Sequence, residues 1–214
     1  MHRTLLAAVS AVLLAGSVPA VGQSGLVRVR LHTSAGPITL ALDAKRAPIT
    51  TANFMAYVDD GRFDGTVFYR AARSKARPGN GFIQGGVRTD LRRALPPIDL
   101  EPTSRTGIRH LDATVSMAHG TFDASATGNF VLTVGPSPQM DARPGFSGYA
   151  AFGRVTGGMD AVRRILGQPS GGGSGPMRGQ IILRPVRIRR AVRLDGAPKP
   201  TGRPKVWLIL RGSG

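Results

Sequence analysis

Two short apolar runs between residues 67 and 87 place the strongest constraint on how this chain can fold. Val-Phe-Tyr-Arg at residues 67–70 and Gly-Phe-Ile-Gln-Gly-Gly at residues 81–86 each interrupt apolar residues with one long polar side chain. Alternation with a period of two is typical of a strand that is buried on one face. The glycine pair marks a sharp turn or a close approach to the backbone. An arginine and a glutamine among aromatic residues suit a groove that binds a peptide backbone.

Other segments extend this pattern along most of the chain. Helices are predicted at residues 49–59, opened by Pro48 with Thr50 or Thr51 as the cap, and at residues 159–166. Many strands with non-local pairing and two short helices predict a mainly β fold, a closed antiparallel barrel with helices capping its ends. The further strands are expected at residues 26–33, 38–42, 113–118, 129–134, 150–155 and 181–188.

The connecting segments are predicted from their composition. Residues 71–80 read as an exposed basic loop, and residues 89–107 as a loop in which two prolines prevent regular structure. Residues 170–175 have the composition of a flexible linker. Residues 195–214 form a basic tail rich in proline and glycine, ending in an apolar run at 206–210 that either pairs with an edge strand or is disordered.

The first residues have the features of an export signal. A short basic start precedes an apolar core at residues 5–15, and small residues at 18–20 suit cleavage. The apolar core is shorter than the about 20 residues of a membrane-spanning helix. A signal peptide at residues 1–22 is therefore predicted, with a periplasmic or secreted mature protein; a buried N-terminal helix is the alternative. The remaining chain is expected to hold one domain at residues 26–194.

Charge and cysteine content limit the possible partners. The formal net charge is +17, and the chain has no cysteine, so it has no disulfide, no thiolate chemistry and no lipoprotein anchor. The arginines are scattered, without a basic helix or interleaved aromatic residues, so nucleic-acid binding is not predicted. Weak attraction to anionic envelope surfaces is a hypothesis, and a monomer is expected.

Three blocks, in a fixed order, resemble one protein family. Residues 68–70 and 82–86 read Phe-Tyr-Arg and Phe-Ile-Gln-Gly-Gly; residues 115–118 and 125–131 read Val-Ser-Met-Ala and Ser-Ala-Thr-Gly-Asn-Phe-Val. Residues 149–155 add Tyr-Ala-Ala-Phe-Gly-Arg-Val. These blocks are similar to the signatures of the cyclophilin-type peptidyl-prolyl cis-trans isomerases. The resemblance spans most of the mature chain.

The resemblance implies an eight-stranded barrel and catalysis of rotation about X-Pro bonds in flexible polypeptides, without a cofactor or a metal. It implies that Arg70 is the catalytic donor and that Gln84 holds the substrate backbone. Phe82, Met117, Phe130 and Met140 would line the pocket for the proline ring. The other residues that the resemblance assigns to substrate binding are Tyr69, Ala118, His119, Asn129 and Tyr149.

Several positions depart from the family pattern. Tyr69 replaces a histidine, His119 an asparagine, Asn129 a glutamine and Val131 a phenylalanine. Gln139 stands where many members have the tryptophan that binds cyclosporin, so weak inhibition by that drug is expected. An alternative function is therefore a binding module of the same fold that grips proline-containing peptides with little turnover. A third hypothesis is that the arginine-rich surface and tail tether the domain to an anionic surface.

Other kinds of site have little support. The histidines lack the spacing of metal ligands, and no HExxH motif is present. Ser147 does not fit the G-x-S-x-G pattern of a nucleophile elbow. The glycines at 171–175 lack the lysine and the strand–helix setting of a phosphate-binding loop.

Overall fold

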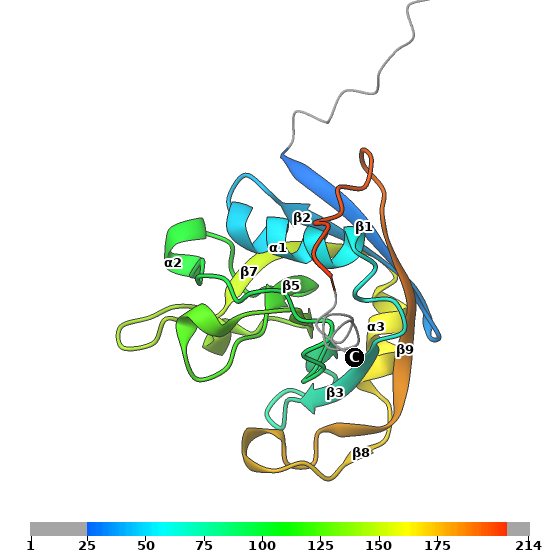
Figure 1. Cartoon of the computed structure of the whole chain (residues 1–214). Coiled ribbons are helices and arrows are strands. Elements are labelled where there is room, and N and C mark those ends of the chain that lie inside the picture. Colours follow the sequence, from blue (N-terminus) through cyan, green and yellow to red (C-terminus); the bar gives the residue numbers. More distant parts are fainter. Residues whose placement is uncertain (1–24, 205–214) are drawn as a thin grey trace, which may run out of the picture.

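The computed structural model describes residues 25–204, whose antiparallel strands close into a barrel (Figure 1). The strands are β1 (Leu26–Thr33), β2 (Gly36–Asp43), β3 (Val67–Arg73), β4 (Gly81–Gly86), β5 (Thr114–Met117), β6 (Asn129–Val134), β7 (Ala150–Gly157), β8 (Ser170–Gly171) and β9 (Ile181–Arg193). The helices are α1 (Pro48–Asp59), α2 (Thr103–Thr106) and α3 (Met159–Leu166), and the short 3₁₀ turns are η1 (Asp123–Ser125), η2 (Pro138–Met140) and η3 (Gly175–Met177).

All strand pairs are antiparallel, in the order β1-β2-β7-β5-β6-β4-β3-β9, and β9 pairs with β1 to close the ring. The two residues of β8 add only a short extension to β9. The predicted eight-stranded mainly β barrel is thus confirmed. Alternation decides which side chains enter it: in β1, Val29 and Leu31 are fully buried, whereas Arg28 and Arg30 are exposed.

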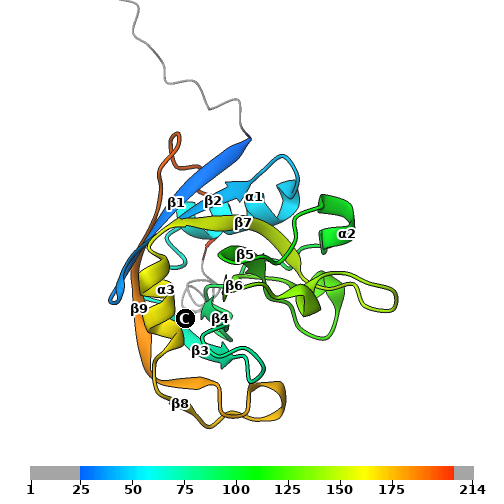
Figure 2. The same ribbon diagram turned by 180° about the vertical axis from the view of Figure 1, so that it is seen from behind.

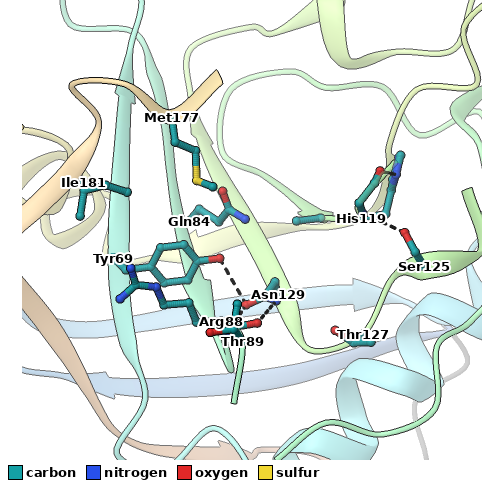
Figure 3. Close-up of a pocket in the computed structure, with 12 residues that line it drawn as sticks. Tyr69, Gln84, Arg88, Thr89, His119, Ser125, Thr127, Asn129, Met177 and Ile181 are labelled. Atoms are coloured by element: carbon teal, nitrogen blue, oxygen red, sulfur yellow. Dashed lines mark hydrogen bonds between the residues drawn. The ribbon is translucent and has the colours of Figure 1, made fainter. Parts of the chain in front are cut away.

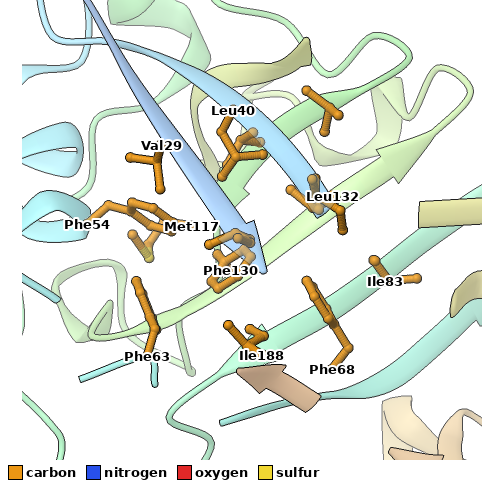
Figure 4. Packing of buried hydrophobic residues seen from close by; sticks show 14 of the residues in the cluster. Val29, Leu40, Phe54, Phe63, Phe68, Ile83, Met117, Phe130, Leu132 and Ile188 are labelled. Carbon is orange, nitrogen blue, oxygen red and sulfur yellow. The ribbon is translucent and has the colours of Figure 1, made fainter. Parts of the chain in front are cut away.

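The interior of the barrel is an aromatic and aliphatic core (Figure 4). The ring of Phe130 meets the rings of Phe54, Phe63 and Phe68 edge-on, with centroids 5.2 to 5.7 Å apart. Edge-to-face pairs of this kind add about 0.5–1.5 kcal/mol each to the burial of the rings. Phe54 comes from α1, so this core joins the helix to the strands.

The glycine pair of β4 allows close packing, as its sequence predicts. A Cβ atom on Gly85 would lie 2.7 Å from the ring of Phe68. Gly86 has a φ of 120°, and a Cβ there would collide with the carbonyl oxygen of Gly128. Only glycine fits at these two positions, which brings β4 against the core and against the start of β6.

Helices α1 and α3 lie toward opposite ends of β2 (Figures 1 and 2). The predicted cap of α1 is wrong. Neither threonine caps the helix; Thr50 and Thr51 are buried, and their hydroxyls have no hydrogen-bond partner among residues 25–204. The buried carboxylate of Glu101 instead accepts the backbone N–H groups of Ile49 (3.2 Å) and Thr50 (2.7 Å). A distant loop thus supplies the anion that the start of a helix favours.

Three connecting segments are more ordered than their composition indicates. The segment predicted as an exposed loop at residues 71–80 begins within β3, and Ala71 is buried. The segment predicted as loop at residues 89–107 contains the one-turn helix α2. The glycine-rich segment predicted as a flexible linker forms β8, which pairs with β9, and leads into η3. No helix among residues 25–204 is long and apolar enough to cross a membrane.

Residues 195–204, which follow the domain expected at residues 26–194, fold back onto the end of α1. Asp195 binds Arg28, the backbone N–H of Lys199 binds Asp59, and Thr201 donates two hydrogen bonds to Asp60. We call this segment the C-terminal strap. The predicted signal peptide at 1–22 and the apolar run at 206–210 lie outside the described residues.

Candidate functional site

A row of side chains crosses the outer face of five neighbouring strands. Arg70 of β3 pairs with Gln84 of β4, which pairs with Val131 of β6; Val131 pairs with Ser116 of β5, and Ser116 with Ala151 of β7. Paired residues on adjacent strands point to the same face, and on β4, β5 and β6 neighbours of this row such as Ile83, Val115 and Phe130 lie in the core. Strand register therefore brings residues from positions 70 to 151 into one line. We call this line the outer row.

A β-bulge places two neighbouring polar side chains at one end of this row. The register of β3 shifts between Phe68 and Arg70, so Tyr69 has no partner on β4. The extra residue lets Phe68 stay in the core while Arg70 faces outward. The hydroxyl of Tyr69 donates to the side-chain oxygen of Asn129 (3.3 Å). Burial raises the pKa of Tyr69 to about 12, so its hydroxyl is a neutral donor.

Arg70 is held by uncharged groups. Its Nε donates to Oε1 of Gln180 (2.8 Å), one Nη to Oε1 of Gln84 (3.0 Å) and the other to the carbonyl oxygen of Pro176 (3.2 Å). The guanidinium also lies 5.0 Å from the ring centre of Phe82. Burial lowers the pKa of Arg70, yet no carboxylate among residues 25–204 forms an ion pair with it. Its full positive charge remains available to a bound molecule.

A pocket of about 540 Å³ lies next to Gln84 (Figure 3). Its walls come from β3, β4, β6, the loop after β5 and the segment that leads into β9. Five of the predicted site residues, Tyr69, Gln84, Ala118, His119 and Asn129, line it together with Arg88, Thr89, Gly120, Ser125, Thr127, Met177 and Ile181.

Two more predicted residues, Met140 and Tyr149, lie next to each other beside His119. The backbone N–H of Tyr149 donates to the carbonyl of Met140 (3.0 Å), which joins the loop before β7 to η2. The ring of His119 lies 4.7 Å from that of Tyr149, and its Nε2 lies 2.9 Å from the carbonyl oxygen of Gly148. The phenol of Tyr149 is also close enough to influence the pKa of Arg70.

Two predicted pocket residues are instead part of the core. Met117 is 1% exposed and Phe130 is fully buried, and both belong to the cluster inside the barrel (Figure 4). The assignment of these two to the proline pocket is therefore wrong. Alternation along β6 explains it: Val131 lies on the outer row, so its neighbour Phe130 points inward. Val131, named above only as a departure from the family pattern, is the residue that pairs with Gln84.

Phe82 lies at the edge of this arrangement. Its partly buried ring contacts the Arg70 guanidinium, and it lines a separate hollow with Pro138 and Gln139. Asn129 is likewise occupied: its amide nitrogen donates to the carbonyl of Arg88 (2.9 Å) and its oxygen accepts the Arg88 N–H (2.7 Å). Asn129 therefore fixes the turn after β4, and its side chain is not free to hold a peptide.

Ser116 of the outer row belongs to a chain of three polar side chains, in which Ser116 and His110 are buried. Nε2 of His110 lies 2.8 Å from the hydroxyl of Ser116, and Nδ1 lies 2.7 Å from the carboxylate of Asp141. Hydrogen bonds in the same succession, from serine to histidine to aspartate, occur in a nucleophilic triad. Ser116, however, is 0% exposed. No substrate can reach its oxygen in this conformation, so the chain of bonds supports the wall of the site and does not attack a substrate.

Burial of His110 predicts a pH-dependent stability. Burial lowers the pKa of His110, and the neighbouring Asp141 only partly opposes this. The unfolded chain, with a histidine pKa of about 6.5, therefore binds the proton more readily than the folded chain. The free energy of unfolding should fall as pH drops through 6.5 toward the folded pKa, and stay level above that window.

Urea unfolding of the His110→Gln variant between pH 7.5 and 5 tests this. The variant is expected to be less stable at neutral pH but to show a flatter slope in the acid window. His32→Gln is the matched control, because His32 is exposed on β1, and it should keep the wild-type slope. If the free energy of unfolding of His110→Gln falls with pH as steeply as that of wild type, His110 is not the cause of the pH dependence.

Comparisons with known proteins agree with this geometry. Residues 28–192 match the family model described as cyclophilin type peptidyl-prolyl cis-trans isomerase. The chain is 37% identical over 168 residues to peptidyl-prolyl cis-trans isomerase A of Dickeya dadantii, covering 77% of this chain and 85% of that protein. It is 37% identical over 166 residues to the isomerase cyp18 of Streptomyces antibioticus, covering 76% and 96%.

Solved structures share the fold. A cyclophilin type isomerase of Cryptosporidium parvum superposes with a TM-score of 0.62 at 19% identity, covering 80% of this chain and 99% of that one. A second crystal structure of that protein, obtained in the presence of the dipeptide Ala-Pro, gives a TM-score of 0.62 at 20% identity, covering 79% and 99%.

Proposed function

The chain belongs to the cyclophilin-type peptidyl-prolyl cis-trans isomerase family and is an enzyme of that class, and we propose that it rotates X-Pro bonds on the outer row next to Arg70. The observation that carries this proposal is the state of Arg70. Its guanidinium is partly buried, held by three neutral acceptors and free of any carboxylate among the described residues.

Such a group suits the chemistry of X-Pro rotation. The barrier to amide rotation is about 18–20 kcal/mol because twisting breaks conjugation. In the twisted state the proline nitrogen regains its lone pair, and an N–H donor aimed at that nitrogen stabilises it. One preorganised donor contributes about 3–4 kcal/mol, and strain imposed on the substrate about 1–5 kcal/mol. Together these correspond to an acceleration of about 10³- to 10⁶-fold.

The substrate backbone is assigned to the Gln84 side of the site. The Oε1 atom of Gln84 is occupied by Arg70, so the end of its side chain that can serve a substrate carbonyl is the NH₂ group. Val131, Met140 and Tyr149 are assigned to the wall that receives the proline ring. No covalent step is required, since only the conformation of the amide changes.

We further propose that the enzyme is exported and assists the folding of proline-containing chains outside the cytoplasm. The export proposal rests on the basic and apolar pattern of residues 1–22. N-terminal sequencing of the protein recovered from a periplasmic fraction or the medium is expected to start near residue 23. Recovery of the intact N-terminus in the cytoplasm contradicts it.

The folding role is tested by refolding. An unfolded protein with a slow phase limited by an X-Pro bond refolds over tens to hundreds of seconds. Adding the mature chain in substoichiometric amount is expected to speed that phase, and adding the Arg70→Ala variant is not. If short peptides are turned over while the slow phase stays unchanged, the folding role is wrong and the isomerase activity stands.

The alternative function is a peptide-binding module with little turnover. It is favoured by the engagement of Asn129 with Arg88 and by the contacts of the two His119 ring nitrogens with the carbonyl oxygens of Gly120 and Gly148, because both remove polar groups from a substrate. An NMR titration with an X-Pro tetrapeptide distinguishes the two functions. The module predicts shifted peptide resonances with no faster cis–trans exchange, whereas the enzyme predicts both.

Attraction to an anionic surface has a structural basis on one side of the barrel. Outward positions of β1 and β9 carry exposed cationic side chains that form no ion pair among residues 25–204. They are Arg30, Arg184, Arg187, Arg189 and Arg190. Binding to vesicles that contain anionic phospholipid is expected, weakening steeply between low and physiological salt. Neutral vesicles are the control, and binding that does not change with salt contradicts the proposal.

Inhibition by cyclosporin is expected to be weak. Gln139 is exposed on η2, and its amide cannot provide the apolar area and the indole N–H of a tryptophan. The Gln139→Trp variant is expected to bind the drug more tightly than wild type, and Gln168→Trp, at a partly exposed position outside the hollow that Gln139 lines, should not. Inhibition constants from a peptide isomerisation assay provide the test, and nanomolar inhibition of the wild type contradicts the prediction.

A further inference from the structure

We propose that Gln180 is a positioning residue for Arg70, and that the loop at residues 172–180 exists in part to present it. This inference rests on the proposed role of Arg70 and assigns a function to a segment that none of the motifs above includes. The observation behind it is a closed set of hydrogen bonds between Arg70, Gln180 and Pro176. We call residues 172–180 the clasp loop.

The clasp loop has a defined shape because of its glycines. Gly172, Gly173, Gly175 and Gly179 all have φ values between 51° and 75°, a region that other residues rarely adopt. A Cβ on Gly173 would lie 2.5 Å from the carbonyl oxygen of Met177. The N–H of Gly179 donates to the carbonyl of Gly172 (2.6 Å), which closes the loop at its base. The composition of a flexible linker here encodes a tight turn.

The base of the clasp loop is fixed to the strand that carries Arg70. The backbone N–H of Ala71 donates to the carbonyl of Gln180 (2.9 Å), and Ile181 pairs with Arg70 in the sheet. Gln180 therefore stands beside Arg70 by backbone register, before any side-chain contact is considered. This backbone pairing holds the side chains of Gln180 and Arg70 close enough to form a hydrogen bond.

The side chains then form a closed triangle. Oε1 of Gln180 accepts from Nε of Arg70 (2.8 Å), and its Nε2 donates to the carbonyl oxygen of Pro176 (3.0 Å). The same Pro176 oxygen accepts from an Nη of Arg70 (3.2 Å). Each of the three groups is thus bound to the other two. A guanidinium fixed at Nε and at one Nη cannot rotate about its final bonds without breaking both contacts.

The acceptors of the triangle are neutral, which matters for catalysis. A carboxylate at the place of Gln180 would also hold Arg70, but it would cancel the charge that the twisted amide needs. With an amide and a carbonyl as partners, Arg70 is oriented and stays cationic. Of its five N–H donors, three are used by Gln180, Gln84 and Pro176, which leaves two for a bound peptide.

This arrangement predicts the behaviour of two variants at position 180. Gln180→Met has a similar length but no acceptor, so Arg70 loses its Nε partner. We expect kcat to fall about 10-fold with KM within twofold, since small displacements of a catalytic group cost up to about 10²-fold. Gln180→Glu keeps an acceptor for Nε of Arg70 but adds a negative charge. We therefore expect kcat to fall here as well, although Arg70 stays in place. Gln168→Met, at a partly exposed glutamine before the clasp loop, is the matched control.

The direct readout is the Nε–H resonance of Arg70, identified by its absence in Arg70→Lys. In wild type and in Gln180→Glu we expect it to be sharp and protected from exchange with water. In Gln180→Met we expect it to broaden, together with the loss in kcat. Wild-type kcat in Gln180→Met, or a reduced kcat with an unchanged Nε–H resonance, overturns the positioning role. If instead Arg70→Ala keeps full activity, the proposed catalytic role of Arg70 is wrong. This result distinguishes a failure of that role from a failure of the positioning role of Gln180.

Discussion

Replacing Arg70 by alanine is expected to lower kcat/KM for an X-Pro tetrapeptide by about 10²- to 10³-fold, the loss that follows removal of one preorganised donor. The side chain contributes no core packing, because it lies on the outer row and contacts Gln84, Gln180 and Pro176. The fold should therefore persist, and the far-UV circular dichroism and urea midpoint of the variant should stay close to those of wild type.

Arg70→Lys separates charge from geometry. Lysine keeps the positive charge but lacks the planar set of donors that contacts three acceptors at once. We expect it to recover only a small part of the lost activity. Arg190→Ala is the matched control, since Arg190 is an exposed arginine on β9, and it should retain wild-type rates. Activity above a tenth of wild type in Arg70→Ala would show that the catalytic donor lies elsewhere.

Removing the C-terminal strap is expected to destabilise the domain by about 3–5 kcal/mol. The Arg62 guanidinium, 2% exposed, donates to Asp60 and to the carbonyl oxygen of Arg203. Asp60 in turn accepts two hydrogen bonds from Thr201. Each hydrogen bond to a charged group contributes about 1.5–3 kcal/mol, and buried charges that lose partners are costly.

Two truncated chains test the strap. A chain that ends at Leu194 loses all of these contacts, whereas a chain that ends at Pro204 keeps them, so the difference between their urea midpoints isolates the strap. Thr201→Val should reproduce part of the loss, because it removes one of the two hydrogen bonds to Asp60. Lys199→Ala should be neutral, because only the backbone of Lys199 binds Asp59. Equal midpoints for the two truncated chains contradict the prediction.

The parts of the fold that depend on local pattern could be predicted from the sequence. Alternation between residues 67 and 87 predicted both strands, whereas the outward direction of Arg70 depends on the bulge at Tyr69. The glycine pair at 85–86 indicated close packing, which Phe68 and Gly128 provide. These features are encoded within a few residues of one another, since side-chain direction and left-handed backbone are local properties.

Features that depend on distant partners could not be predicted. Motif position alone assigned Phe130 and Met117 to the groove, but the register of β6 turns them inward and turns Val131 outward. The cap of α1 comes from Glu101, more than 50 residues away. No sequence signal links Gln180 to Arg70 either, because that contact requires the pairing of β9 with β3.

We propose that Arg70, which is cationic and forms no ion pair with a carboxylate among residues 25–204, catalyses X-Pro rotation on the outer face of this barrel. Exchange NMR on a proline tetrapeptide with a substoichiometric amount of the mature chain measures that rotation directly, at equilibrium and without a coupled reaction. The predicted result is cis–trans exchange well above the uncatalysed rate with wild type, and exchange near the uncatalysed rate with Arg70→Ala. Peptide resonances that shift on binding while the exchange rate stays uncatalysed with wild type would contradict it.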